Sequence, residues 1–219
     1  MSAGREIVSF YLNRPDWNEV IRPELPFGAV ANGEFVQDLN NSSSYLEFGS
    51  GASTLVASES NVKRIVSIES DRDFLAAVRV QIAAQQDVNT EIDYLYADIG
   101  PTGPWGVPLF KSRLWRMRER WPNYSLVPWI ELGSDFRADL VLVDGRFRVA
   151  CALAVIINQA DSNWKLLVDD FAERPEYFPI KDFSELVEMR GRMAVFKPRV
   201  GLNVRSAKLA LQYFQRDWR

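Results

Sequence analysis

The sequence contains no histidine and a single cysteine, Cys151, among its 219 residues. The absence of histidine excludes catalysis by Ser-His-Asp or Cys-His arrangements, imidazole-ligated metal sites and proton transfer by imidazole. Acid–base chemistry is left to carboxylates, lysine, tyrosine or water, and any bound metal must be a hard ion held by oxygen atoms. A lone cysteine cannot form an internal disulfide, which favours a reducing compartment and predicts a cytoplasmic protein.

Long apolar runs and an excess of positive charge are also missing. The longest apolar run, residues 149–157, has about half the length that spans a bilayer. The first residues lack the basic start and apolar core of a signal peptide. The 26 Lys and Arg against 29 Asp and Glu give a net charge of −3, which offers no electrostatic basis for general nucleic-acid binding. We therefore expect neither a membrane nor a nucleic acid among the partners.

The composition that remains, 47% hydrophobic and 25% charged residues, is that of a globular domain. Short apolar runs alternate with segments of helical periodicity. The runs that predict strands are residues 45–48, 64–69, 91–96, 140–143, 166–168, 186–189 and 193–196. The segments that predict helices are residues 52–58, a segment after a capping box at Ser70 to Asp73, and residues 147–160.

Strands separated by helices predict parallel crossovers, so the expected fold class is α/β. We expect a Rossmann-like, mostly parallel seven-stranded sheet with helices on both faces and a C-terminal antiparallel hairpin. A single domain is expected over residues 1–219, with an N-terminal cover at 1–44, a Rossmann-like core at 45–198 and a tail helix at 199–219. The tail helix is expected to pack on the domain or to form a homodimer contact.

The connection over residues 99–138 is longer than an ordinary loop. It contains four of the seven tryptophans, Trp105, Trp115, Trp121 and Trp129. Five cations against Glu119 give it a net charge of +4 over ten residues: Lys111, Arg113, Arg116, Arg118 and Arg120. Two interpretations fit this composition, a solvated helix with tryptophans packed beneath it and a lid that closes over an anionic ligand.

A glycine-rich turn follows the first predicted strand and reads Glu47-x-Gly49-x-Gly51-x-Ser53. Glycines let the backbone approach a ligand, and the start of a helix offers unpaired amides. The turn fails the dinucleotide fingerprint because Thr54 occupies the third glycine position, and it lacks the lysine of a P-loop. Three later strands end at acidic residues, Glu69, Asp98 and Asp144. Because loops at the carboxyl ends of parallel strands line the ligand crevice, these side chains are expected at the functional edge.

These residues resemble the class I S-adenosylmethionine-dependent methyltransferases over roughly residues 45–198. The resemblance implies S-adenosylmethionine as the cofactor, with its methionine part at the glycine turn, its ribose on Glu69 and its adenine near Asp98. The cofactor-binding residues that it implies are Glu47, Gly49, Ser50, Gly51, Ser53, Glu69, Asp98 and Asp144. The segments YLEFGSGASTL, ADIGPTGPWG and LVLVDGRFRVA are also similar to a group of uncharacterised bacterial methyltransferase-like proteins.

The segments VDGRFR and LLVDDF resemble the smaller metal-dependent O-methyltransferases. In those enzymes acidic residues at the ends of strands four and five hold a divalent ion, so the resemblance makes Asp144, Asp169 and Asp170 the candidate ligands here. Arg146 and Arg148 depart from that pattern, and since their charges can balance the carboxylates, we favour a site without a metal. We expect the catalytic centre to consist of Asp144, Asp169, Asp170 and Arg146, whether a divalent ion or an arginine supplies the positive charge.

Three functions remain open at this point. The first is S-adenosylmethionine-dependent methyl transfer to a small or medium-sized acceptor. The positive charges of Arg146, Arg148 and the basic segment would suit an anionic acceptor. The second is a non-catalytic methyltransferase-like binding or scaffold domain. The third is an NAD-type oxidoreductase, which Glu47 and Thr54 disfavour.

Overall fold

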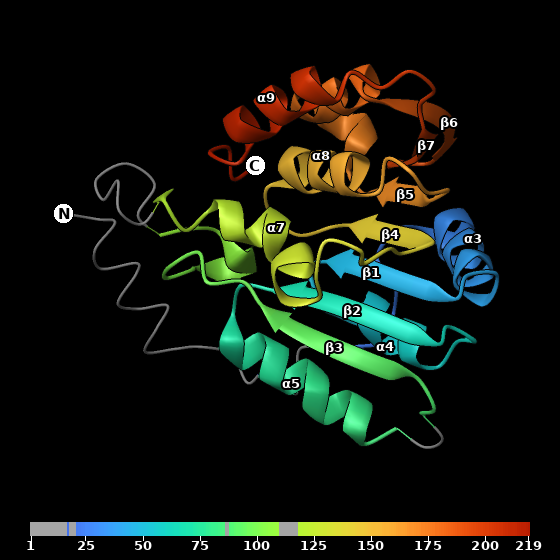
Figure 1. Ribbon diagram of the computed structural model, residues 1–219. Helices are drawn as coiled ribbons and strands as arrows, with labels where there is room; N and C mark the ends of the chain where they lie inside the picture. The colour runs from blue at the N-terminus through green and yellow to red at the C-terminus, as the bar shows by residue number, and fades with distance from the viewer. Residues whose placement is uncertain (1–16, 18–20, 86–87, 110–117) are drawn as a thin grey trace.

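The computed structural model describes residue 17 and residues 21–85, 88–109 and 118–219. The strands form one sheet: β1 (Ser44–Phe48), β2 (Arg64–Glu69), β3 (Glu91–Tyr96), β4 (Leu140–Val143), β5 (Lys165–Val168), β6 (Ser184–Arg190) and β7 (Met193–Pro198). Their spatial order is β3-β2-β1-β4-β5-β7-β6, which can be followed in Figure 1. The expected α/β class with a seven-stranded sheet is therefore confirmed.

The first five strands are parallel and the last two reverse the direction. β1 pairs in parallel with β2 and with β4, so that Glu47 stands opposite Ser67 on one side and Leu142 on the other. β7 runs antiparallel both to β5 and to β6. The β6–β7 turn contains Gly191 at a φ of 62°, a left-handed conformation that glycine adopts without strain. The expected C-terminal hairpin is confirmed.

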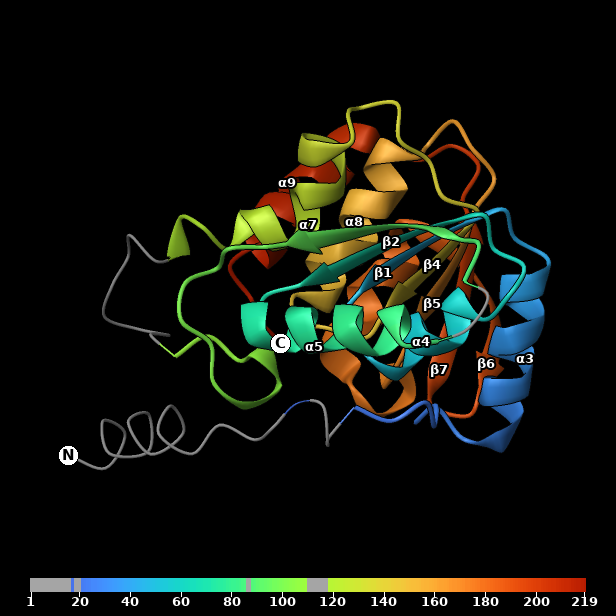
Figure 2. The same ribbon diagram turned by 90° about the horizontal axis from the view of Figure 1, so that it is seen from below.

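Helices cover both faces of the sheet. Figure 2 shows α3 (Ala29–Asn40), α4 (Ala52–Ser58) and α5 (Arg72–Ala83) on one face and α7 (Pro122–Glu131), α8 (Arg148–Asn158) and α9 (Val204–Phe214) on the other. Strand β4 is apolar on both sides: Leu140 and Leu142 pack in the cluster with α3, and Val141 and Val143 pack in the cluster with α7 and α8. Its unbroken LVLV sequence is thus the consequence of burial on both faces.

The tail helix α9 packs on α8 in this fold. Ala207 and Leu211 of α9 are buried, and the Gln215 side chain donates a hydrogen bond to Ser125 Oγ of α7 at 3.1 Å. Two short 3₁₀ helices, η2 (Phe171–Glu173) and η3 (Pro175–Asp182), connect β5 to the hairpin. Among the described residues, no helix has the length and apolar content needed to cross a bilayer.

One expected helix start is off by a residue. The cap of α5 is Asp71, whose side chain accepts hydrogen bonds from the amides of Asp73 and Phe74. The hydroxyl of Ser70, expected as the cap, instead donates to Glu69 Oε1 at 3.1 Å. Ser70 does not cap the helix because its hydroxyl is hydrogen-bonded to the carboxylate of Glu69.

The long connection between β3 and β4 divides into two parts. Residues 101–109 form a loop closed by a bridge between Thr102 and Pro108, with the 3₁₀ helix η1 (Pro104–Gly106) inside it. From Trp121 onwards the chain belongs to the core, with Trp121 and Trp129 buried. For this second part, burial favours the interpretation in which the tryptophans pack into the domain. Four of the basic and aromatic residues named for this connection lie outside the described residues: Lys111, Arg113, Trp115 and Arg116.

Candidate functional site

The strand order reverses at β1, which places a crevice at the carboxyl ends of β1 and β4. From β1 the chain moves outwards to β2 and β3, and then it returns to β4 and β5 on the other side. In an open parallel sheet, ligands bind outside the strand ends at such a reversal. The turn at residues 49–51 follows β1 here, and the turn at residues 144–145 follows β4.

These two turns touch through their backbones. The amides of Asp144 and Gly145 both donate to the Phe48 carbonyl, at 3.0 and 2.6 Å. A Cβ on Gly49 would lie 2.7 Å from the Gly145 nitrogen, and a Cβ on Gly145 would overlap the Tyr124 hydroxyl. Gly49 also has a φ of 104°, which disfavours any residue with a side chain. Both glycines are therefore required by the contact between the turns.

Glu47 is buried beneath the glycine turn and has no solvent exposure. Its two carboxylate oxygens accept hydrogen bonds from the hydroxyls of Tyr45, Ser53, Thr54 and Ser67. Thr54 Oγ1 also accepts from the Gly51 amide at 2.9 Å, which ties the turn to the same network. Burial raises the pKa of Glu47, and the hydroxyl donors oppose that rise. Glu47 and Ser53 thus hold the turn in shape from inside.

Glu69 ends β2 with one carboxylate oxygen bonded and the other open. Oε1 accepts hydrogen bonds from the amides of Ser70 and Asp71, at 2.5 and 2.9 Å. Oε2 accepts no hydrogen bond from any residue in the described part of the chain. Burial raises the pKa of Glu69 to about 7. A carboxylate held in this way presents a second acceptor atom to a ligand.

Asp98, the acidic residue after β3, is engaged with its own connection. Its Oδ1 accepts from the Gly100 amide at 3.0 Å, and its Oδ2 pairs with Arg120 Nη1 at 3.0 Å. The pair is about half exposed, so its contribution to stability is small. Arg120 therefore spans the distance between the start of α7 and the end of β3.

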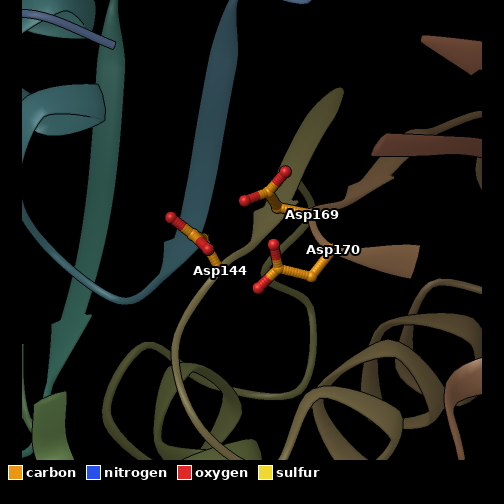
Figure 3. Close-up of side chains that lie close together, drawn as sticks. All are labelled: Asp144, Asp169 and Asp170. Carbon is orange, nitrogen blue, oxygen red and sulfur yellow. The ribbon is translucent and has the colours of Figure 1, made fainter. Parts of the chain in front are cut away.

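Three aspartates lie close together after β4 and β5, as Figure 3 shows. Asp144, Asp169 and Asp170 each place a carboxylate oxygen within 4.8 Å of the others. Parallel neighbouring strands bring these ends together because β4 and β5 run in register, with Val143 opposite Val168. The structure thus assembles the three carboxylates that the sequence singled out.

Two arginines hold the three carboxylates. Arg148 of α8, itself buried, pairs with Asp144 Oδ1 at 2.9 Å and with Asp170 Oδ2 at 3.2 Å. It also donates to the carbonyl oxygens of Asp144, Gly145 and Asp169. Arg192 of the β6–β7 turn forms a bidentate pair with Asp169, at 2.9 and 2.6 Å, and lies 3.3 Å from Asp170 Oδ1. Two cations against three carboxylates leave one negative charge in excess.

The excess negative charge of the cluster affects the pKa of Asp144. Burial raises the pKa of Asp144 to about 7, Arg148 opposes the rise, and Asp169 and Asp170 add to it. In contrast, hydrogen bonds with Asp169 raise the pKa of Arg192, so this arginine stays charged. The pKa of Asp144 therefore lies closer to neutral pH than that of an ordinary aspartate.

The cluster does not fit a divalent metal ion in this arrangement. Both oxygens of Asp169 are bonded to Arg192, and Asp170 is divided between Arg192 and Arg148. Asp144 Oδ2 is the carboxylate oxygen here that has no partner among the described residues. A Ca²⁺ or Mg²⁺ ion would find one open carboxylate oxygen here, and each further carboxylate ligand would require Arg148 or Arg192 to move.

Arg146 differs from the other two arginines. Its Nε is shielded from solvent and has no hydrogen-bond partner. No ion pair within the described residues includes its guanidinium. A Cβ built on Gly106 would lie 3.7 Å from Arg146 Cγ, 3.1 Å from Ser70 Oγ and 3.9 Å from Glu69 Oε1. The loop at residues 101–109 therefore crosses the edge between the ends of β2 and β4.

The sequence identified the acidic residues of this edge and Arg148 as a cation that balances them, but not their other partners. It missed Arg192, Ser67 and Tyr124, which come from the hairpin, from β2 and from α7. The alternation of strands and helices contains no signal that Arg192 would reach Asp169. For Ser67 a weak signal exists, because it stands two residues before Glu69 on a strand that neighbours β1.

Known structures of methyltransferases resemble this chain. A methyltransferase-like protein from Silicibacter pomeroyi DSS-3 is 33% identical, with a TM-score of 0.78 and coverage of 89% of this chain and 98% of that chain. An O-methyltransferase from Bacillus cereus in complex with S-adenosylhomocysteine is 13% identical, with a TM-score of 0.49 and coverage of 90% of each chain. NodS, an N-methyltransferase from Bradyrhizobium japonicum WM9 in complex with S-adenosylhomocysteine, is also 13% identical, with a TM-score of 0.48 and coverage of 90% and 96%. No protein-family model and no curated protein matches the chain.

The strand order, the glycine turn after β1 and the acidic end of β2 define the class I S-adenosylmethionine-dependent methyltransferase fold. The resemblance noted in the sequence is thereby confirmed at the level of this superfamily. Because the Silicibacter pomeroyi protein is 33% identical over nearly the whole of both chains, this chain belongs to the same family of methyltransferase-like proteins.

Proposed function

We propose that this protein transfers a methyl group from S-adenosylmethionine to a small or medium-sized acceptor. The observation that carries the proposal is the open Oε2 of Glu69 at the end of β2, 20 residues after Gly49. A carboxylate in this place accepts hydrogen bonds from ribose hydroxyls. Membership in a methyltransferase-like family supports S-adenosylmethionine over NAD as the nucleoside that binds there.

The chain's own residues would have to align donor and acceptor. S-adenosylmethionine, when bound, supplies a methyl group on a positively charged sulfur, so the transfer needs little covalent help. Alignment of the reacting groups alone can contribute roughly 7–11 kcal/mol to lowering a barrier. The rigid contact between the turns at Gly49 and Gly145 supports such alignment, because it fixes the spacing of the two strand ends.

Asp144 is the residue that we assign to the acceptor. Arg148 holds its Oδ1 at 2.9 Å, while its Oδ2 accepts no hydrogen bond from the described chain. With a pKa of about 7, its carboxylate can take a proton from an acceptor hydroxyl or amine near neutral pH. The negative charges of Asp169 and Asp170 lie close to Asp144 and help to raise its pKa. Arg148 and Arg192 supply the positive charge that a divalent ion would otherwise supply.

Calorimetric titration tests this function. We expect S-adenosylmethionine and S-adenosylhomocysteine to bind and NAD not to bind. The variant Glu69→Ala loses the ribose acceptor, so its affinity for S-adenosylhomocysteine should fall by about 1–3 kcal/mol, or roughly 5- to 150-fold. The control Glu131→Ala removes an exposed carboxylate at the end of α7 and should bind as the wild type does.

Each competing function has its own outcome in these titrations. If Glu69→Ala and the wild type bind S-adenosylhomocysteine with equal affinity, Glu69 is not a cofactor-binding residue. Binding of NAD alone indicates an oxidoreductase. Cofactor binding without methyl transfer to any of a broad set of acceptors indicates a binding or scaffold domain.

A further inference from the structure

Arg146 is a cation at the functional edge that forms no ion pair with the described residues. Arg148 and Arg192 pair with Asp144 Oδ1 and with the oxygens of Asp169 and Asp170, and Asp144 Oδ2, which stays open, forms no ion pair with Arg146. Its Nε is closed off from water and makes no hydrogen bond in the described structure. A half-buried guanidinium without an ion-pair partner lowers the stability of a protein unless a bound anion supplies the missing charge. The unpaired state of Arg146 therefore points to an anionic ligand.

The electrostatic surroundings of Arg146 support this reading. Burial lowers the pKa of Arg146, and the neighbouring charge of Arg148 adds to the effect. The nearby hydroxyls of Tyr124 and Tyr177 and the carboxyl of Asp144 act in the opposite direction, but none of them forms an ion pair with it. An incoming anion would therefore meet a guanidinium that is only partly hydrated.

The position of Arg146 links the two parts of the proposed reaction. It follows Asp144 by two residues, and its stem packs beside Gly106, which itself lies against Ser70 and Glu69. It therefore stands between the carboxylate assigned to the ribose and the carboxylate assigned to the acceptor.

We propose that Arg146 binds the anionic group of the acceptor, a carboxylate or a phosphate, and so sets which acceptors are methylated. This inference rests on the proposed methyl transfer. The planar fork of a guanidinium matches two oxygens of either group and gives geometric selectivity as well as affinity. An uncharged acceptor of the same shape would leave Arg146 unpaired and would be disfavoured. Arg148, by contrast, is a positioning residue because its donors are already used.

The test measures anion binding directly. The wild type, saturated with S-adenosylhomocysteine, is titrated with inorganic phosphate and with acetate, and we expect saturable binding of at least one of them. In Arg146→Gln this affinity should fall by roughly 10- to 100-fold, and Arg146→Lys should restore part of it. The control Arg205→Gln removes one exposed cation from α9 and should leave the affinity unchanged.

A second arm separates the acceptor from the carboxylate of the cofactor itself. The affinities of each variant for S-adenosylhomocysteine and for 5′-methylthioadenosine, which lacks the amino-acid part, are compared. We expect Arg146→Gln to leave both unchanged. A loss confined to S-adenosylhomocysteine would assign Arg146 to the cofactor and overturn the proposal.

Two further results would also overturn it. One is equal anion affinity in Arg146→Gln and the wild type, and the other is no anion binding by the wild type. Repeating the titration without S-adenosylhomocysteine separates this proposal from the proposed function. If the protein binds no cofactor, the methyl transfer fails, while the anion titration still reports on Arg146.

Discussion

At the scale of single residues, four acidic side chains that look alike in the sequence have different surroundings. Both carboxylate oxygens of Glu47 accept hydrogen bonds from four hydroxyls beneath the turn, whereas one oxygen of Glu69 accepts none from the described residues. Asp98 is paired with Arg120 at a half-exposed position. Asp144 shares Arg148 with another carboxylate and carries the excess charge of its cluster. Hydrogen-bond partners, and not position at a strand end, separate the residues that shape this site from those that can meet a ligand.

Asp144 predicts a distinctive dependence of stability on pH. Its pKa of about 7 lies above the value of about 4 in an unfolded chain, so the native state binds the proton more tightly. Its contribution to the free energy of unfolding is therefore complete below about pH 4 and is lost as the pH rises to about 7. Relative to Asp144→Asn, the wild type should lose stability across this range by an amount on the order of 2–4 kcal/mol. Urea denaturation of both proteins over a series of pH values measures the difference.

Asp161→Asn serves as the control for this experiment. Arg137 lowers the pKa of Asp161, so its contribution is lost as the pH falls and not as it rises. Stability curves of the wild type and Asp144→Asn that run parallel from pH 4 to pH 8 would contradict a raised pKa at Asp144.

At the scale of secondary-structure elements, the C-terminal hairpin takes part in the site. Its turn brings Arg192 to Asp169, a side chain that is 1% exposed, although 23 residues separate them. The antiparallel pairing of β7 with β5 fixes this approach, because Ala194 stands opposite Val168. The turn between the two antiparallel strands thus supplies a cation at the carboxyl end of the parallel strand β5.

Arg192 predicts that divalent cations are without effect on the wild type. Neither a chelator nor added Mg²⁺ should change its thermal midpoint or its transfer rate. Arg192→Met uncovers both oxygens of Asp169, so it should be destabilised by about 3 kcal/mol and should regain stability when Mg²⁺ or Ca²⁺ is added. Differential scanning calorimetry with and without the cation measures both effects.

Arg199→Met is a matched control, since Arg199 follows the same hairpin but donates only to the carbonyls of Lys181 and Asp182. A wild-type midpoint that rises with Mg²⁺, or a rate abolished by the chelator, would show that a metal displaces the arginines.

At the scale of the whole molecule, the sequence predicted the architecture and the edge that bears function. The strands were recognisable because parallel strands buried on both faces are continuously apolar, as in β4. Apart from Arg148, the partners of the acidic residues were not recognisable, because contacts such as Arg120 with Asp98 depend on how a long connection folds back. For the long connection, the sequence left two interpretations open for a related reason: tryptophans are compatible with a lid and with a packed core. The burial of Trp121 and Trp129 favours the packed core for that part of the connection.

The packing of α9 predicts that the tail belongs to the same folding unit. Leu211 is 8% exposed and packs in the large core cluster with α8, whereas Leu209 on the same helix is 61% exposed. Leu211→Ala should lower the free energy of unfolding by about 2–3 kcal/mol, and Leu209→Ala by less than about 0.5 kcal/mol. Chemical denaturation followed by circular dichroism measures both, and equal effects would contradict the docking of α9.

The backbone contact between Gly49 and Gly145 has a consequence for how the two halves of the site communicate. The two turns meet through backbone atoms, so in the proposed reaction a small rotation of peptide planes at the donor turn would pass directly to the acceptor turn. Such coupling is reciprocal by thermodynamic necessity. If the proposed function holds, a donor analogue that tightens the first turn changes the affinity for the acceptor, and the acceptor changes the affinity for the donor by the same factor.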